Sequence, residues 1–435
     1  MLPRSVSRCF LWSLLLTGSA PLFANGLSLF DAVIRHDQKA VLVLLKGGAN
    51  PNQTRADGAT PLAWAAGRDD AEIANALIRA GANVNTPDEN GDSPLTLASA
   101  NGNVPISKML IDAKADVNHA RWSGETPLLL AVNAGSTELT KLLIDSGAEI
   151  NKAETRYGQT PLMWASAEGA TACTKLLIER GADVNAKSKN GFTALLLAAQ
   201  KGDAESAKAL IAAKADTSYK APDGSTPFLL ALTRGNEAAA LLMLNYGVDV
   251  NAVEANGSTP LHEAVTLGKM QLVRDLVKRG ASFTARTKAP PGPPNPFRVA
   301  GLTPFLAAAQ TGNVAMMKEL VALGADPKDK TPDGAGGLML ATASRKLPAV
   351  QFMIENGADV NESRKGGGTA LHTATRFGST EIIKYLVAHG ADLTAKDRFG
   401  RTPLEEAEFE APKPTIALLK QLTDEAAAKK PEPNK

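Results

Sequence analysis

The chain has 435 residues, a formal net charge of +2, 21% charged residues and 5% aromatic residues. This near-neutral balance argues against nucleic-acid or anionic-membrane binding, which usually needs a basic excess or a clustered basic face. With two cysteines in the whole chain, a disulfide-rich scaffold is excluded.

The N-terminus has the order of a secretory signal. Arg4 and Arg8 precede an apolar run from residue 10 to residue 16, and small residues follow up to Ala24. We expect cleavage after Ala24, and a retained anchor is the alternative. Because the signal carries two arginines and no acids, 47 − 2 = 45 basic residues then face 45 acidic ones. The remaining cysteine, Cys173, would have no partner for an intrachain disulfide.

After the signal, a short run beginning Thr-Pro-Leu or a close variant recurs down the chain. The step is 33 residues, with one extra residue before Thr160 and 11 extra residues before Thr303. Such a period is typical of stacked supersecondary units that cannot bury their apolar faces alone. The first residues of the copies are Thr60, Ser93, Thr126, Thr160, Thr193, Thr226, Thr259, Thr303, Gly336, Thr369 and Thr402.

Residues 181–213 illustrate one unit. The Thr193 hydroxyl is placed to cap a short helix, in which Leu195, Ala198 and Ala199 form the inner face. Gly202 ends this helix, and a second amphipathic helix follows. In most other copies a proline follows the cap, where its missing N–H costs nothing.

The links between units are equally regular. Gly-Ala-Asp-Val-Asn stands at residues 181–185 and 357–361, with variants elsewhere. The glycine predicts a left-handed helix end, and the asparagine suits a tight turn. Asp-Gly or Asn-Gly then predicts a hairpin tip at Gly58, Gly91, Gly191, Gly224 and Gly257.

Together these motifs resemble the ankyrin repeat, and His262 and His372 occupy the histidine position of its Thr-Pro-Leu-His motif. The resemblance implies an all-α repeat protein, a solenoid of about twelve helix–turn–helix units with β-hairpin loops, and a concave face lined by the hairpins and first helices. We therefore expect a signal peptide at 1–24, a capping repeat at 25–58, the array at 59–400, a C-terminal capping repeat at 401–424 and a disordered tail at 425–435.

Two segments depart from the pattern. Residues 286–300 carry the 11 extra residues and five prolines, which favour an extended conformation within a hairpin. If this segment is a docking arm, Phe297 and Arg298 would be its contacts with the partner. The alternative is that the segment is a tolerated surface insertion. In the next unit, Gly336 and Gly337 replace the Thr-Pro cap and Arg345 replaces the inter-helix glycine. We expect a soft joint at residues 334–348.

Catalytic and metal-binding patterns are not found. The five histidines have no metal-ligand spacing, and the residue four positions after His262 is Thr266 rather than a second histidine. His262 is therefore interpreted as a motif histidine bonded to loop backbone, and Cys173 as a core thiol. We expect no cofactor, no metal and no enzymatic activity.

The candidate partner-binding residues occupy positions that the repeat leaves free to vary. Trp, Tyr and Arg dominate binding hot spots. For Trp64 and Trp164, which share one position on the first helix, packing within the stack is the alternative. The candidates are Trp64, Trp122, Arg156, Tyr157, Trp164, Phe192, Arg234, Phe297 and Arg298.

The sequence thus favours a non-enzymatic scaffold that holds a protein partner on its concave face. We expect it in the periplasm or outside the cell, as a monomer without nucleic-acid or membrane binding after signal cleavage. Two alternatives stay open: a secreted effector that binds a host protein, and an enzyme with a site between the proline-rich arm and the groove.

Overall fold

The computed structural model of the chain describes residues 27–254, 256–288 and 299–428. The expected signal peptide at 1–24 and the contacts Phe297 and Arg298 lie outside these residues. The chain divides into two compact units between Trp122 and Ser123.

The described residues form helices in pairs and no regular strand. The first unit holds α1 (Leu29–Ile34), α2 (Gln38–Lys46), α3 (Pro61–Gly67), α4 (Ala71–Arg79), α5 (Pro94–Ala100) and α6 (Val104–Asp112). The second unit begins with α7 (Pro127–Asn133), α8 (Thr137–Asp145), α9 (Pro161–Glu168), α10 (Thr171–Glu179), α11 (Ala194–Lys201), α12 (Ala204–Ala212), α13 (Pro227–Thr233) and α14 (Glu237–Leu244). It continues with α15 (Pro260–Thr266), α16 (Met270–Lys278), α17 (Pro304–Thr311), α18 (Val314–Ala322), α19 (Gly337–Ala343), α20 (Leu347–Glu355), α21 (Ala370–Arg376), α22 (Thr380–Ala388), α23 (Pro403–Glu410) and α24 (Lys413–Ala428).

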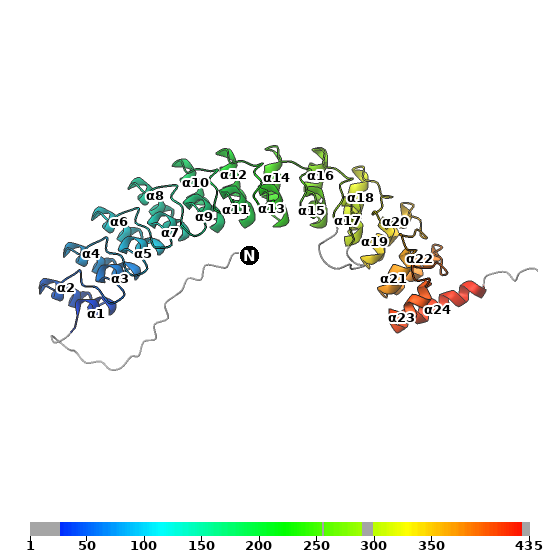
Figure 1. Cartoon of the computed structure of the whole chain (residues 1–435), viewed down its shortest axis with the longest axis horizontal. Helices are drawn as coiled ribbons and strands as arrows, with labels where there is room; N and C mark the ends of the chain where they lie inside the picture. Colours follow the sequence, from blue (N-terminus) through cyan, green and yellow to red (C-terminus); the bar gives the residue numbers. More distant parts are fainter. Residues whose placement is uncertain (1–26, 255, 289–298, 429–435) are drawn as a thin grey trace, which may run out of the picture. The chain divides into compact units, whose positions relative to one another are not determined.

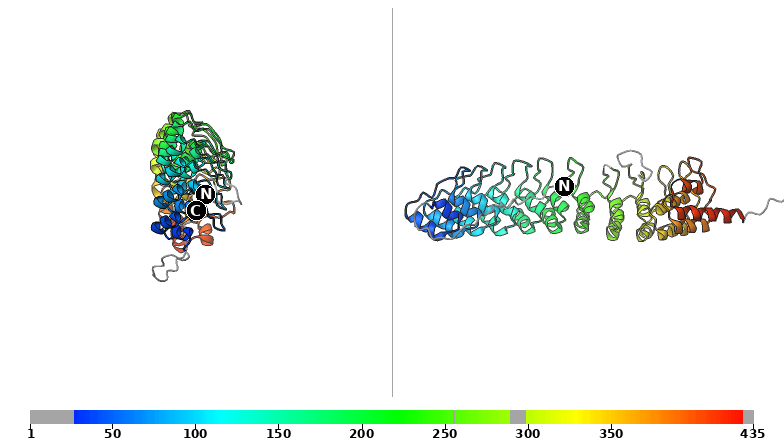
Figure 2. Two further views of the ribbon diagram at one scale, coloured as in Figure 1. Left: turned by 90° about the vertical axis from the view of Figure 1, so that its left-hand side faces the viewer. Right: turned by 90° about the horizontal axis from the view of Figure 1, so that it is seen from below.

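Each unit has two layers. The first helices of successive pairs pack on one another, as α1 on α3 and α7 on α9, and form one layer (Figure 1). The second helices form the other layer, as in the packing of α2 on α4 and of α8 on α10. The loops that join the pairs project to one side of the helices in each unit (Figure 2). This arrangement confirms the expected stack of helix–turn–helix units.

The helix starts are those that the sequence predicts. The Thr60 hydroxyl accepts a hydrogen bond from the Ala63 N–H at 3.0 Å, and Thr193 caps α11 in the same way through the Leu196 N–H at 3.3 Å. Pro61 follows its cap at the first helical position. The end of α11 also agrees, because Gly202 has a left-handed φ of 89°. Local residue choices therefore fix where each short helix begins and ends.

The core runs between the two layers and between neighbouring pairs. Leu62 of α3 and Leu95 of α5 are fully buried in the first unit, and Leu128 and Leu162 hold the same position in the second. Alanines one turn further on, such as Ala65 and Ala98, are also buried and allow the first helices to approach closely. Burial of each pair thus depends on its neighbours, as expected for a repeat array.

A column of asparagine side chains also joins neighbouring repeats. The Asn185 amide donates to the Lys214 carbonyl at 3.2 Å and accepts from the Asp216 N–H at 2.9 Å. The asparagine was expected only to favour a tight turn, whereas its side chain satisfies backbone groups of the next repeat. The same pair of bonds is made by Asn52, Asn85, Asn251 and Asn361.

The loops turn as hairpins but are too short to form strands. In one of them, the Gly191 N–H donates to the Ser188 carbonyl and the Ser188 N–H donates to the Phe192 carbonyl, both at 2.9 Å. Within the described parts of the chain, two isolated antiparallel bridges are the nearest approach to a sheet. They join Lys330 to Gly336 and Ser363 to Thr369.

The insertion at 286–300 does interrupt one of these hairpins. Its two ends meet through the Thr287 N–H, which donates to the Leu302 carbonyl at 3.0 Å, and the Gly301 N–H, which donates to the Thr287 carbonyl at 2.8 Å. Arg286 adds a bond to the Gly301 carbonyl and a 2.7 Å ion pair with Asp329 of the next loop. The base of the insertion is therefore tied into the stack.

The repeat that contains Gly336 and Gly337 folds as a helix pair, and the structure explains why one of these glycines is there. A Cβ at Gly337 would lie 2.6 Å from Met353 Cε and 3.3 Å from Phe305 Cε1, so these side chains fill the space of the usual proline. Arg345 holds the left-handed position with a φ of 61°. Among the described residues, neither α19 nor α20 has a side-chain hydrogen bond at its N-cap.

The last helix, α24, extends to Ala428, beyond the expected repeat end at 424. Within the residues that the structure describes, no helix combines the length and the apolar character needed to cross a membrane.

Candidate partner-binding surface

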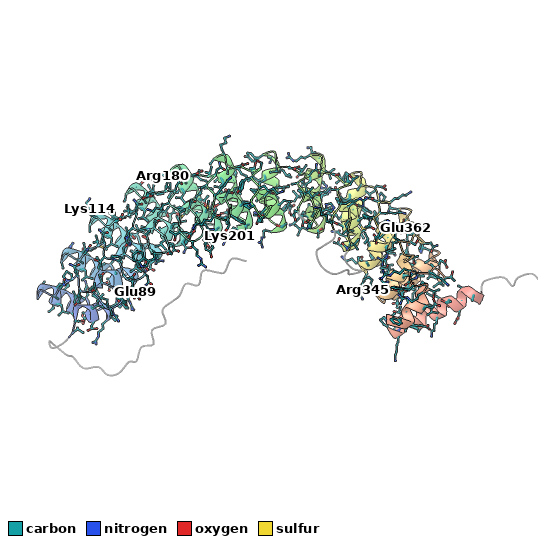
Figure 3. The ribbon with its side chains drawn as sticks, viewed as in Figure 1. Glu89, Lys114, Arg180, Lys201, Arg345 and Glu362 are labelled. Carbon is teal, nitrogen blue, oxygen red and sulfur yellow. The ribbon has the colours of Figure 1, made fainter. Side chains whose placement is uncertain are left out.

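The expected binding residues that the structure describes lie in the loops and on the first helices of both units. Trp64 and Trp122 belong to the first unit, whereas Arg156, Tyr157, Trp164, Phe192 and Arg234 belong to the second. In the second unit, Lys201 and Arg345 lie on the side of the first helices and Arg180 on the side of the second helices (Figure 3).

Trp122 is an exposed side chain in a fixed position. Its side chain is 71% exposed, yet its indole Nε1–H donates to the Glu89 carbonyl of the preceding loop at 2.8 Å. The ring lies against Gly91, where an added Cβ would approach Trp122 Cδ2 to 3.1 Å. The loop is held further by His119, whose Nε2 bonds to the Gly91 carbonyl at 2.8 Å. A large apolar surface is therefore presented with little freedom to lose on binding.

Trp64 is half-buried within the stack. Its ring meets Phe30 of α1 edge to face, with centroids 5.8 Å apart, and the Arg55 guanidinium lies 5.7 Å from its centroid. The Trp64 Nε1 is buried and forms no hydrogen bond with any residue that the structure describes. Packing between first helices, the alternative considered from the sequence, therefore accounts for much of this side chain.

Arg156 and Tyr157 stand at the tip of the loop that carries one extra residue. Tyr157 is 37% exposed, and the Arg156 guanidinium lies 4.9 Å from its ring centroid. Glu154 is 4% exposed, and its carboxylate accepts from the backbone N–H groups of Arg156 at 2.6 Å and Tyr157 at 2.9 Å. It also accepts from the Gln159 N–H at 2.9 Å. Glu154 thus accommodates the extra residue and positions the tip.

The other candidate binding residues of the second unit differ in how exposed their side chains are. Trp164 is half-buried on α9, and like Trp64 it has a buried Nε1 without a hydrogen bond to the described chain. Phe192 is also half-buried, at the base of its loop, where its N–H donates to the Ser188 hydroxyl at 2.9 Å. Arg234 is exposed at the end of α13.

Two aromatic groups in the loops were missed from the sequence. Tyr219 donates its hydroxyl to the Gly191 carbonyl at 2.9 Å, and Lys187 Nζ lies 4.4 Å from its ring centroid. Phe399 is 63% exposed, with Arg398 at 4.6 Å from its ring centroid. Phe399 could have been identified from the sequence, because Arg398-Phe399-Gly400 repeats the order of Arg156-Tyr157-Gly158.

His262, His372 and Cys173 have structural positions, as interpreted from the sequence. His262 Nε2 bonds to the Leu302 carbonyl at 2.9 Å, and His372 Nε2 bonds to the Arg401 carbonyl at 3.1 Å. Burial lowers the pKa of His262 below its ordinary 6.5, although the Leu302 carbonyl and the charge of Glu263 oppose this shift. Cys173 is 1% exposed and lies 3.5 Å from the Thr137 hydroxyl.

Titratable groups do not gather as they would at a metal centre. The structure's described segments contain no group of three or more His, Cys, Asp or Glu side chains arranged to hold a metal ion. Near His262, burial and the charge of Glu263 raise the pKa of Glu254. The arrangement as a whole presents fixed aromatic and cationic side chains at loop tips, which is the chemistry of a recognition surface.

Comparison with known proteins agrees with this arrangement. The family model described as ankyrin repeats in three copies matches residues 29–121, 114–188, 195–287, 290–364 and 338–426. Among solved structures, the chain is similar to the crystal structure of the human ASB11 ankyrin repeat domain. The identity is 26% over 49% of this chain and 96% of that chain, with a TM-score of 0.45. No curated protein matches the chain.

Proposed function

We propose that this chain, which belongs to the ankyrin repeat family, is a non-enzymatic scaffold that binds another protein through its loop tips and first helices. The observation that carries the proposal is Trp122, an exposed indole fixed in place by a bond to the Glu89 carbonyl. Preordered tips lose little entropy on binding, so a few aromatic and arginine contacts suffice for useful affinity. The proposed scaffold acts as a monomer in the periplasm or outside the cell.

The loops of both units supply contacts of this kind, and each can be tested separately. Crosslinking of the full chain in its native organism, followed by mass spectrometry, identifies the partner. Trp122→Ala tests the first unit, and Tyr157→Ala combined with Trp164→Ala tests the second. Because hot-spot truncations each cost on the order of 2 kcal/mol, we expect partner recovery to fall by roughly tenfold or more in either variant.

Matched controls come from exposed apolar residues of the second helices. Val43 on α2 and Tyr246 just after α14 are 68% and 49% exposed. Val43→Ala and Tyr246→Ala should leave partner recovery unchanged, and circular dichroism checks that every variant is folded. Equal recovery of the partner with Trp122→Ala, with the double variant and with the unchanged chain would argue against this surface.

Export is tested independently of binding. The expected signal ends at Ala24, so N-terminal sequencing of the mature protein should begin at Asn25. Cell fractionation separates a periplasmic protein from one released outside the cell. A chain that starts at Met1 and stays in the cytoplasm would contradict the proposed location.

A further inference from the structure

Three successive loops of the second unit form a basic and aromatic edge. They are the loops that follow α8, α10 and α12. A cation lies over an aromatic ring in the first loop, and a cation of the second loop lies over an aromatic ring of the third. We call this surface the basic edge, and its residues are Arg156, Tyr157, Lys187, Lys189, Tyr219 and Lys220.

We propose that the basic edge binds an acidic, extended segment of the partner protein. This inference rests on the proposed scaffold function and specifies the chemistry of the partner at one part of its surface. Three observations support this inference: the cations of the edge have no carboxylate partner, its loops are fixed by bonds to one another, and the loops are regularly spaced.

The cations of the basic edge have no carboxylate partner. In the described chain, no ion pair is formed by Arg156, Lys187, Lys189 or Lys220, all of which are exposed. In other loops, comparable cations form ion pairs with carboxylates of the chain. Arg121 pairs with Asp92, Arg286 pairs with Asp329 at 2.7 Å, and Lys330 pairs with Glu362. The positive charges of the basic edge are therefore left available to an outside anion.

Most acidic residues of the same three loops are engaged with backbone, and Glu149 pairs instead with Lys152, which is not part of the edge. The Glu154 carboxylate is buried beneath the tip and accepts only backbone N–H groups. Asp183 and Asp216, at the starts of their loops, accept from the N–H groups of Asn185 and Ser218, each at 2.9 Å. Asp223, nearest to the third tip, accepts from the Ser225 N–H at 2.9 Å. None of them neutralises a cation of the edge.

The edge is also held in shape. The Lys189 N–H donates to the Tyr157 carbonyl at 2.8 Å, and Lys189 Nζ donates to the Thr155 carbonyl, which joins the first loop to the second. Tyr219 joins the third loop to the second through its bond to the Gly191 carbonyl. Arg156 and Lys187 rest over the rings of Tyr157 and Tyr219. Cations fixed over aromatic faces bind an anion without first being ordered.

The spacing of the loops indicates the form of the ligand. Neighbouring repeats stack about 8–10 Å apart, as packed helices do. An extended chain advances about 3.3–3.6 Å per residue, so about three residues span one repeat. Carboxylates at every third position of an extended segment would therefore each meet one loop. A nucleic acid is less suited, because the whole chain carries a net charge of only +2.

The test uses two synthetic peptides and the full chain. One peptide is extended and has glutamate at every third position, and the second has glutamine at those positions. Binding is followed by fluorescence anisotropy at low and at physiological salt. We expect the glutamate peptide to bind with an affinity that falls as salt rises, and the glutamine peptide to bind at least about tenfold more weakly.

Two charge-matched variants locate the site. Lys187→Gln, Lys189→Gln and Lys220→Gln together remove three charges from the edge. Lys141→Gln, Lys208→Gln and Lys318→Gln remove three exposed charges from the second helices α8, α12 and α18. Exposed ion pairs are individually weak, so we expect about a tenfold loss of affinity in the edge variant and no change in the control.

Several outcomes would overturn the proposal. They are equal binding of both peptides, equal weakening in both variants, and tighter binding of single-stranded DNA than of the glutamate peptide. A partner recovered by crosslinking that binds the edge variant as well as it binds the unchanged chain would also reject the basic edge, while leaving the scaffold function intact. Conversely, failure to recover any protein partner would reject the scaffold function whatever the peptides do.

Discussion

At the scale of single residues, the exposed side chains of the surface are fixed by bonds to neighbouring backbone. Trp122 donates to the Glu89 carbonyl, and Tyr157 is positioned by the carboxylate of Glu154. The sequence identified Trp122 and Tyr157 as candidates because of their type and their position in the repeat. It did not identify Glu154, since its role depends on where one extra residue bends the loop.

His262 is a residue whose protonation should affect stability. Its Nδ1 accepts from the Thr259 N–H at 3.3 Å and its Nε2–H donates to the Leu302 carbonyl, an arrangement that requires the neutral ring. Because burial holds its folded pKa below 6.5, its contribution to stability is full above pH 6.5 and is lost as the pH falls toward the folded pKa. We predict that the free energy of unfolding decreases as the pH is lowered from about 6.5 to about 5.5.

The matched variant is His262→Gln, because glutamine also serves at the third position of a capping box. We expect thermal unfolding midpoints of this variant to fall less over the same pH interval. Glu254, whose pKa is raised, acts in the opposite direction above pH 4.5, but it is present in both proteins and cancels in the comparison. Parallel pH profiles for the two proteins would show that His262 does not carry the effect.

At the scale of the element, short helices here depend on caps and on the fit between neighbouring repeats. The α3 and α11 helices begin at threonine caps, as the sequence predicts. The α19 helix begins at Gly337, for which the local pattern offers no positive reason. The structure supplies one, since Met353 of α20 and Phe305 of α17 occupy the space that a side chain would need.

Gly337→Ala should therefore destabilise the protein, although alanine is the better helix former. The added Cβ would meet Met353 Cε at 2.6 Å, and because Met353 is only 2% exposed its methyl group has little space to move into. Overpacking of this kind costs about 1–3 kcal/mol. The gain in helix propensity is about 1 kcal/mol. Urea unfolding of the full chain measures the difference in the free energy of unfolding.

The Met353→Ala background provides the control for Gly337→Ala. Removing the methionine side chain is itself destabilising, but it clears the contact, so Gly337→Ala should there be neutral or stabilising. In a double-mutant cycle, the variant with both substitutions should therefore lose less free energy of unfolding than the sum of the losses of the two single variants. Additive effects of the two substitutions would contradict the packing explanation.

At the scale of the whole molecule, stability is distributed among neighbouring repeats rather than concentrated in one core. Within each unit, a pair of helices packs chiefly on the neighbouring pairs of that unit, so a weak pair opens locally. The pair formed by α19 and α20 departs furthest from the repeat pattern. Within the described chain both helices lack a side-chain cap bond, and Arg345 adopts a left-handed backbone.

We predict that backbone amides in residues 334–348 exchange hydrogen faster than those in 301–315, the corresponding part of the preceding repeat. A missing cap costs about 1 kcal/mol, and a left-handed residue other than glycine costs about 1–2 kcal/mol. Exchange should therefore be at least roughly tenfold faster. Hydrogen exchange followed by mass spectrometry measures both segments in one experiment.

Arg345→Gly is the matched variant for this comparison, because it removes the left-handed strain and keeps the helix boundaries. It should slow exchange in residues 334–348 and leave residues 301–315 unchanged. Exchange in the unchanged chain that is as slow at 334–348 as at 301–315 would refute the soft joint.

The sequence by itself determined the repeat, the starts and ends of most helices and the buried leucines and alanines. These features follow from local physics: a hydroxyl that caps the first turn, a glycine that takes a left-handed φ, and apolar residues at helical spacing. Only the tertiary structure decided what happens between repeats. The asparagine column and the joined loops of the basic edge depend on distances between residues about 30 positions apart in the chain. The fit of Met353 at Gly337 depends on how two neighbouring helices pack, and the role of Glu154 depends on the path of its loop backbone. No local pattern encodes these distances.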